Sequence, residues 1–212
     1  MLINLRNALM AGKRLPYDAE VEYLESTGTQ YVDTGVLANG EFDFDYMFRM
    51  NTLQSNTVGM GARSASQFLT ALQINGSQRF TFAYLYTVWS NGEWNVSNID
   101  YRVQLSFHSG SQSATVNDTV LFTDNKVGTE LLNLPIYIFK RSNSGTETIY
   151  GLSGRFYFCK IWQNGTLVRD YIPVRKATVG YLYDRVSGKL FGNAGTGAFS
   201  YGNDLEYPIP AE

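Results

Sequence analysis

Residues Gly151–Phe199 read GLSGRFYFCKIWQNGTLVRDYIPVRKATVGYLYDRVSGKLFGNAGTGAF, and this stretch decides the fold class. From Gly154 to Gln163 apolar or aromatic residues alternate with others, as in a β-strand that has one buried face. The dipeptide Asn164-Gly165 follows at once and suits a type I′ turn, in which both central residues need positive φ. The stretch therefore predicts a β-hairpin. Pro173 is expected to end its second strand, because proline has no N–H to donate to the ladder.

Short apolar runs separated by turns continue along the rest of the chain. Phe42–Phe48 alternates aromatic with other residues almost throughout, which is typical of a half-buried antiparallel strand. Asn117-Asp118 is expected to form a tight turn, and Trp89–Asn98 is expected to be a polar loop that carries aromatic residues. Trp162, inside the hairpin strand, is interpreted as a core residue. About a dozen short strands indicate an all-β protein of two packed antiparallel sheets.

Length and composition favour one domain and argue against several kinds of function. The chain has 212 residues, of which 44% are hydrophobic and 15% aromatic, enough for one large sandwich. A formal net charge of −2 gives no basic surface of the kind that binds nucleic acid or anionic membranes. Cys159 is the only cysteine and His108 the only histidine, so neither an intrachain disulfide nor a structural zinc site is expected. Cys159 is interpreted as a buried structural thiol.

The first residues of the chain carry a different pattern. Leu2, Ile3, Leu5 and Leu9 recur at helical spacing and predict a short amphipathic helix in residues 1–16. A helix this short is marginal alone in water, so it packs either on its own domain or, as an assembly anchor, on a neighbouring molecule. The expected organisation is an anchor segment (1–16), a β-sandwich (17–203) and an extended tail (204–212). Neither a transmembrane run nor an export signal is recognisable.

Two long strings in the sequence resemble one known family. Gly154–Lys176 and Gly180–Phe199 resemble the C-terminal half of concanavalin-A-like lectin/glucanase (laminin-G-like) domains, and Val21–Val36 (VEYLESTGTQYVDTGV) resembles their N-terminal half. The subgroup in question occurs in gut-bacterial surface proteins and in phage structural proteins. The resemblance implies a concanavalin-A-like β-sandwich (jelly roll) of two antiparallel sheets, here with a short N-terminal helix. It specifies the fold rather than the chemistry, because one fold carries many functions.

An aromatic stretch rich in amides is the first candidate binding site. Tyr84, Tyr86, Trp89 and Trp94 are interleaved with polar residues that include Asn91. A sugar presents an apolar face, on which rings stack, and a rim of hydroxyls, to which amides hydrogen-bond. These five residues are therefore predicted to bind carbohydrate. The alternative is that the tryptophans close one end of the core, since large aromatic side chains are mostly buried.

A row of acids is the second candidate. Glu41, Asp43 and Asp45 alternate along a predicted strand and so share one face. Laminarinase-type glycoside hydrolases, on the resembled fold, use a Glu-x-Asp-x-Glu strand, and retaining hydrolysis needs two carboxyls about 5–5.5 Å apart. This chain departs from that pattern in its third acid and in the early position of the strand. We interpret the acids as a solvated strand face and predict no catalytic residue; in an enzyme, Glu41 would be the nucleophile and Asp45 the acid/base.

Calcium is the third question. Ca²⁺ takes about six to eight oxygen ligands, and Asp118, Asp124, Asn125 and Asp184 could each supply one. Their spacing does not match a calcium loop, so neither a metal nor another cofactor is predicted.

Taken together, the sequence predicts a non-catalytic phage virion surface protein, either a head decoration or a tail or fibre appendage, that binds host-surface glycans. Its partners would be other virion proteins, contacted through the N-terminal segment, and further copies of itself, with a trimer as the expected oligomer. Nucleic acid and membrane are not expected partners. The alternatives are a purely structural decoration protein, a bacterial extracellular or cell-surface adhesin, and a glycoside hydrolase.

Overall fold

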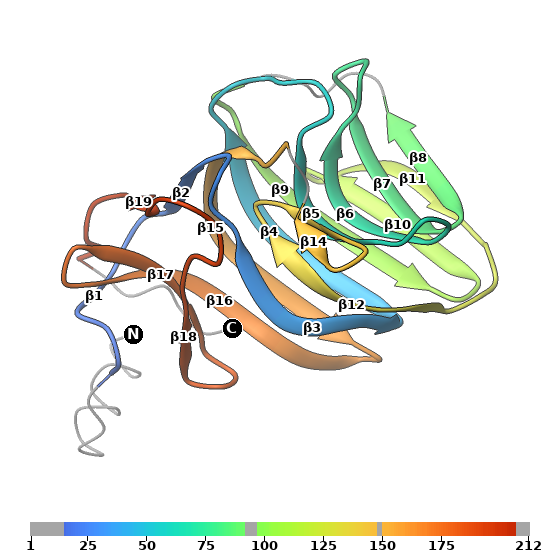
Figure 1. Cartoon of the computed structure of the whole chain (residues 1–212). Helices are drawn as coiled ribbons and strands as arrows, with labels where there is room; N and C mark the ends of the chain where they lie inside the picture. Colours follow the sequence, from blue (N-terminus) through green and yellow to red (C-terminus); the bar gives the residue numbers. More distant parts are fainter. Residues whose placement is uncertain (1–14, 92–96, 148–149, 207–212) are drawn as a thin grey trace.

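The computed structural model describes residues 15–91, 97–147 and 150–206, which form a β-sandwich of two sheets (Figure 1). The predicted all-β class and the two packed antiparallel sheets are confirmed. The predicted helix and its anchor residues Leu2, Ile3, Leu5 and Leu9 lie outside the described part, so both stay predictions. Of the predicted tail, only residues 204–206 are described.

The larger sheet has eleven strands and contains the hairpin predicted from Gly154–Pro173. Its strand pairings are antiparallel, as expected for a sheet with one face on the core and the other in solvent. In sheet order it consists of β11 (Thr119–Asp124), β10 (Ser111–Val116), β9 (Asp100–His108), β4 (Phe42–Met50), β15 (Ser153–Gln163), β16 (Thr166–Lys176), β17 (Val179–Asp184) and β18 (Lys189–Phe191), with β1 (Ala19–Glu20) beside β16, and β2 (Leu24–Thr27) beside both β15 and β19 (Ser200–Tyr201).

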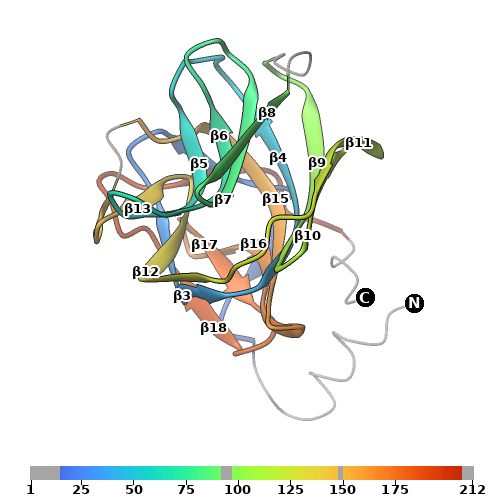
Figure 2. The ribbon, with the colours of Figure 1, turned by 90° about the vertical axis from the view of Figure 1, so that its right-hand side faces the viewer.

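The smaller sheet has eight strands and covers the inner face of the larger one. Its members are β14 (Thr146–Glu147), β13 (Arg141–Asn143), β5 (Val58–Arg63), β6 (Phe68–Ile74), β7 (Phe80–Leu85) and β8 (Thr87–Asn91), with β12 (Glu130–Ile138) pairing both β5 and β3 (Val32–Gly40). The β13–β5 pair is parallel, and the other pairs are antiparallel. In Figure 2, strands β5, β6 and β7 lie to the left of β4, β15 and β9, which shows the two layers.

The core between the sheets is aromatic, and β4 shows why the sequence builds it. Side chains alternate across a strand, so every second residue of β4, from Phe42 to Met50, is buried. Phe48 is fully buried, and its ring lies within 6.2 Å, between centroids, of the rings of Tyr101, Phe156 and Phe80. Because Phe80 belongs to the smaller sheet, this ring cluster joins the two layers. The intervening residues of β4 are left on the outer face of the larger sheet.

Both predicted tight turns are confirmed by their backbone angles. Asn164 and Gly165 have φ of 50° and 75°, and Asn117 and Asp118 have φ of 45° and 63°. Positive φ at both central residues is the requirement of the type I′ turn, which Asn and Gly meet at little cost. The first turn joins β15 to β16, and the second joins β10 to β11.

The prediction that Pro173 ends its strand is wrong, since β16 continues to Lys176. On one side of the strand, the pairing with β15 reaches no further than Tyr171. On that same side of β16, pairing with β1 begins at Val174. Pro173 therefore stands between two partners, where a missing N–H leaves no ladder bond unmade. Its carbonyl accepts a hydrogen bond from the N–H of Val21 at 3.1 Å.

The sole cysteine is buried, as predicted. Cys159 is 1% exposed within the core cluster, and burial raises the pKa of its thiol well above the ordinary value. A protonated, enclosed thiol is unreactive. In residues 15–91, 97–147 and 150–206 there is no helix long and apolar enough to cross a membrane.

Candidate functional site

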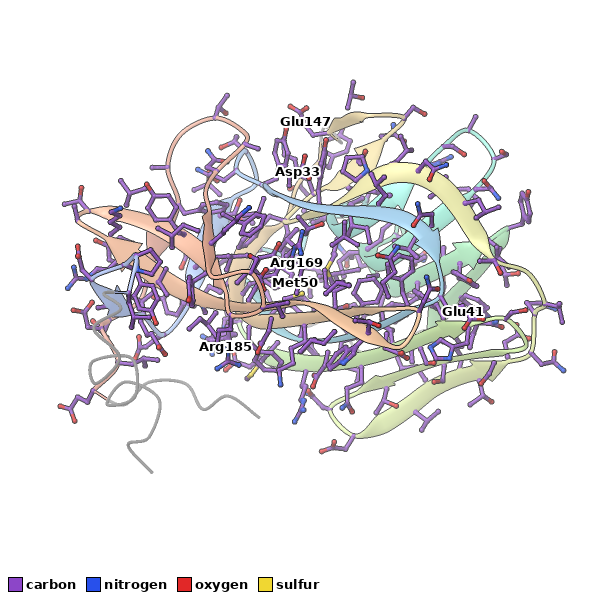
Figure 3. The ribbon with its side chains drawn as sticks, turned by 90° about the horizontal axis from the view of Figure 1, so that it is seen from below. Asp33, Glu41, Met50, Glu147, Arg169 and Arg185 are labelled. Atoms are coloured by element: carbon purple, nitrogen blue, oxygen red, sulfur yellow. The ribbon has the colours of Figure 1, made fainter. Side chains whose placement is uncertain are left out.

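The outer face of the larger sheet carries an open groove of about 380 Å³, named here the first groove. The side chains that reach it come from strands that are far apart in sequence and adjacent in the sheet. Figure 3 labels Glu41, which directly precedes β4, and Met50, which ends it; β4 is one of the inner strands of this sheet. The groove is lined by Asp43, Phe44, Asp45, Gln104, Leu105, Ser106, Ser113, Thr115, Trp162 and Gly165.

Strand register arranges the lining side chains in two rows across four strands. Residues directly opposite in an antiparallel pair share a face and touch. The pairings across β15, β4, β9 and β10 place Trp162 beside Asp43, Asp43 beside Ser106, and Ser106 beside Ser113. The next row, two residues along each strand, consists of Lys160, Asp45, Gln104 and Thr115.

The acids of the groove are held by basic side chains. The Nε2 atom of His108 lies 2.9 Å from Oδ2 of Asp43. Arg102 donates two hydrogen bonds to Asp45, from Nε at 3.1 Å and from Nη2 at 2.8 Å. Asp43 and Asp45 thus point to the outer face, as the alternation predicted, but both are paired with basic side chains. The Arg102 guanidinium offsets the charge of Asp45, and both contacts fix carboxylate oxygens in place.

Glu41 belongs to a different part of the surface. It precedes β4, and its Oε1 accepts a hydrogen bond from the backbone N–H of Ser109 at 2.8 Å. Neither Glu41 nor His108 lines the first groove. The three acids singled out from the sequence are therefore each hydrogen-bonded to a different partner, rather than being gathered around one reacting centre.

Other polar side chains of the first groove have hydrogen-bonding capacity to spare. Within the described part of the chain, the side chains of Gln104, Ser106, Ser113 and Thr115 make no hydrogen bond, and neither does the indole N–H of Trp162. Together they offer both donors and acceptors. A groove lined by one large ring and several free hydroxyl and amide groups suits a ligand that has an apolar face and many hydroxyls.

Trp162 is the residue that the sequence interpretation placed wrongly. It was expected in the core, but it is half-buried on the outer face, where it pairs with Asp43. β15 bulges against β4 between Phe156 and Phe158, so that Cys159 and Ile161 are buried and Trp162 is turned outward. Bulges re-aim side chains and are frequent beside functional sites.

A second hollow of about 490 Å³, named here the second groove, lies on the same face. At its base the Nε of Arg49 donates to Asp100 at 2.6 Å, and the hydroxyl of Tyr157 donates to the same carboxylate at 2.7 Å. The Arg49 hydrogen bond lowers the pKa of Asp100, because it favours the ionised carboxylate. The groove is lined by Glu22, Tyr23, Arg49, Asp100, Tyr157, Phe158 and Leu205.

The Tyr157 hydroxyl makes stability sensitive to alkali. Burial, followed by the hydrogen bond to Asp100, raises the pKa of Tyr157 to about 12, whereas an unfolded tyrosine titrates near 10. The folded state thus keeps a proton that the unfolded chain loses, so this contribution, complete below about pH 10, falls between about pH 10 and 12. We expect the urea midpoint of the wild type to drop more over this range than that of Tyr157→Phe. Equal drops would contradict the assignment.

The structure disperses the predicted aromatic site. Tyr84 is fully buried, with its ring stacked on Phe107 at 5.3 Å, so the prediction that it contacts a ligand is wrong. Trp89 lies in strand β8, not in a loop. Its ring stacks on Phe122 at 4.5 Å and its Nε1 donates to Asp124 at 2.9 Å. Trp89 is partly buried and packs against the core, which fits the alternative that a tryptophan closes one end of the sandwich.

For the other three residues of that predicted site, the structure does not decide whether they bind a ligand. Tyr86 is 69% exposed at the turn before β8. Asn91 ends β8, and its side chain lies outside the described part, as does the whole of Trp94. A role for these three residues in binding stays a prediction.

The calcium candidates are scattered. Asp118 is in the β10–β11 turn, and Asp124 and Asn125 are at the end of β11. Asp184 is fully buried, where its oxygens accept hydrogen bonds from three backbone N–H groups and a hydroxyl. Among the residues that the structure describes, no three His, Cys, Asp or Glu side chains come together as a metal site would require.

Comparison with known proteins identifies the fold. No protein-family model matches the chain, and no curated protein matches its sequence. A candidate carbohydrate-binding protein from Bacteroides ovatus matches with a TM-score of 0.62 and 12% identity, over 90% of this chain and 62% of that one. At this identity the match shows a shared β-sandwich fold.

Two further solved structures match over smaller shares. A Trypanosoma rangeli sialidase in complex with 2,3-difluorosialic acid matches with a TM-score of 0.47 and 13% identity, over 70% of this chain and 26% of that one. Tailspike protein 2 of Escherichia coli O157:H7 bacteriophage CAB120 matches with a TM-score of 0.42 and 12% identity, over 70% and 23%. In all three cases the chain spans less than two thirds of the matched protein.

Proposed function

We propose that this chain is a non-catalytic carbohydrate-binding domain of the concanavalin-A-like type, and that it binds glycans in the first groove. The observation that carries the proposal is the groove itself, where the half-buried ring of Trp162 stands beside side chains with free hydrogen-bonding groups. Sugar rings stack on indole, and their hydroxyls pair with amides, hydroxyls and fixed carboxylates. The fold shared with a candidate carbohydrate-binding protein from Bacteroides ovatus agrees with this assignment.

The proposed absence of catalysis rests on the state of the acids. Retaining hydrolysis requires one carboxyl that gives up a proton and a second that attacks the sugar. Asp45 accepts hydrogen bonds from Nε and Nη2 of Arg102, and Glu41 lies outside the groove. A glycoside hydrolase is the competing assignment. It predicts β-glucan cleavage that Glu41→Gln abolishes, whereas the binding domain predicts no cleavage of a broad polysaccharide panel.

The biological setting is proposed from the sequence resemblance. The strings at Val21–Val36 and within Gly154–Phe199 resemble a subgroup that occurs in phage structural proteins and gut-bacterial surface proteins, and on this resemblance we place the domain on a virion surface, as a head decoration or a tail or fibre appendage facing host glycans. Residues 1–16 would contact other virion proteins, and the assembly would be a homotrimer. A bacterial cell-surface adhesin and a purely structural decoration protein are the alternatives.

Trp162→Ala tests the binding site. We expect it to weaken binding to the best polysaccharide of a panel of β-glucans, mannans, xylans, lipopolysaccharides and capsules. The loss should be about thirtyfold, because truncating a tryptophan at the centre of an interface removes about 2 kcal/mol. Isothermal titration calorimetry would measure it, with thermal melting to show that the half-buried position tolerates alanine.

Tyr86→Ala is the matched control for this prediction. It removes a ring that is 69% exposed and distant in sequence from the groove strands, and it belongs to the aromatic site first predicted. Unchanged binding in Tyr86→Ala, with loss in Trp162→Ala, places the ligand in the first groove. The opposite pattern would return the site to the Tyr86–Trp94 stretch. A folded protein that binds no polysaccharide of the panel would favour the purely structural role.

A further inference from the structure

The two grooves on the outer face are built from the same three strands. On each of β4, β9 and β15, one side chain of the first groove has a counterpart in the second groove four residues away. The pairs are Asp45 with Arg49, Gln104 with Asp100, and Trp162 with Phe158. An even number of steps along a strand keeps the same face, and four steps span about 13 Å. The two grooves therefore lie on one continuous face of the sheet.

Between the two grooves lie Met47 on β4, Arg102 on β9 and Lys160 on β15. Met47 pairs with Arg102 on one side and with Phe158 on the other. Arg102 is drawn toward the first groove by its two hydrogen bonds to Asp45, and its guanidinium lies 5.9 Å from the centre of the Phe158 ring. Arg102 is thus held against the sheet by contacts on both sides.

A β-bulge supplies the aromatic wall of the second groove. The β15–β4 ladder skips a residue between Phe156 and Phe158, so Tyr157 and Phe158 both line the outer surface. A regular strand would send one of two neighbouring residues into the core. The rings of Tyr157 and Tyr23 meet edge to face at 5.9 Å. The regular pairing of β15 with β4 is thus broken at the point where the rings of Tyr157 and Phe158 are both placed on this face.

The second groove is lined by two acids, Glu22 and Asp100, and by one base, Arg49, and the arginines in and beside it are paired. Arg49 pairs with Asp100 at 2.6 Å, and Arg155, which lies 4.0 Å above the Tyr23 ring, pairs with Glu25 at 2.6 Å. Arginines engaged in this way are not placed to recognise an anionic sugar. The exposed chemistry of the groove is instead that of ring and aliphatic surfaces, which suit the apolar face of a neutral sugar.

We propose that the ligand is a linear oligosaccharide or polysaccharide that runs along β4 and β15 and occupies both grooves, with a neutral sugar residue in the second. This inference rests on the proposed function of the first groove. A sugar chain that reaches both grooves binds more tightly than a short one, because its second contact forms within the same complex. A ligand of one or two sugars reaches one groove alone.

The test is a length series. The polysaccharide that binds best in the panel is partly hydrolysed and separated into oligosaccharides of increasing length, and each is titrated calorimetrically into four full-length proteins. These are the wild type, Phe158→Ala, Trp162→Ala and the control Tyr86→Ala. We expect wild-type affinity to rise by about tenfold or more once the chain spans both grooves. Phe158→Ala should bind short oligosaccharides normally and lose this rise, whereas Trp162→Ala should weaken all lengths.

The outcomes separate the two proposals. Affinity that is independent of length, or that rises equally in Phe158→Ala, overturns the two-groove ligand and leaves the first groove intact if Trp162→Ala still weakens binding. Wild-type binding by Trp162→Ala at every length, or no binding by any protein, overturns both. Should Phe158→Ala melt at a lower temperature, Leu205→Gln on another wall of the second groove replaces it, with the same expectation.

Discussion

Phe48→Ala is expected to lower the free energy of unfolding by about 3–5 kcal/mol, the cost of a large core cavity. Phe48 is fully buried, and its ring contacts Tyr101 and Phe156 of the larger sheet and Phe80 of the smaller one. The cavity would lie where the two layers meet, so neither sheet can close it alone. A domain of this kind has about 5–15 kcal/mol of stability in total, so this loss is a large fraction of the free energy of unfolding.

Chemical denaturation measures this change. The urea midpoint should fall while the slope of the transition stays constant, because the surface exposed on unfolding is nearly unchanged. Tyr86→Ala, which removes a ring that is 69% exposed, should change stability by no more than about 0.5 kcal/mol. A loss below about 1 kcal/mol in Phe48→Ala would show that the two sheets are not packed on this ring as described.

Asp184→Ala is expected to cost about 3 kcal/mol or more, because it leaves several buried donors without acceptors. Asp184 is fully buried at the end of β17. Its Oδ1 accepts hydrogen bonds from the N–H groups of Asp170 at 2.9 Å and Val186 at 3.1 Å, and its Oδ2 accepts from the N–H and hydroxyl of Ser187 at 3.2 and 2.6 Å. The carboxylate thus ties the β17–β18 turn to β16.

Thermal and urea unfolding of Asp184→Ala, Asp184→Asn and Asp118→Asn distinguishes a structural carboxylate from a metal ligand. Asp184→Asn keeps the volume but turns an NH₂ group toward donors, so it should also destabilise strongly. Asp118→Asn, in the exposed β10–β11 turn with φ of 63°, should be nearly neutral, since asparagine tolerates this conformation. Stability of the wild type that rises on adding Ca²⁺, and fails to rise in Asp184→Asn, would contradict the structural role.

Local patterns were sufficient where one strand or one turn decides the outcome. The alternation in Phe42–Phe48 correctly placed the aromatic residues in the core and the acids on the outer face. The turn residues Asn164-Gly165 and Asn117-Asp118 correctly located two tight turns, because positive φ is a property of those residues themselves. Side-chain alternation and tight turns are each set by a few consecutive residues, so they can be predicted from the sequence.

The same patterns failed where a residue depends on strands distant in sequence. Trp162 is in a strand as expected, but the bulge that β15 forms against β4 between Phe156 and Phe158 places it on the outer face. Trp89, expected in a loop, is in strand β8, where the backbone pairs with β7 and the ring stacks on Phe122 of the other sheet. The strand passes through Pro173 because two different partners flank that position. A bulge or a change of partner leaves no periodic trace in one strand.

The sequence by itself determined that this protein is an all-β sandwich, since alternation and turn chemistry act over a few residues and recur along the whole chain. Only the tertiary structure decided where a ligand can bind. The first groove joins Trp162, Asp43, Ser106 and Ser113, and it exists because the sheet order sets β15, β4, β9 and β10 side by side. That order is chosen by the burial of both sheets together, a property of the whole chain that no short segment contains.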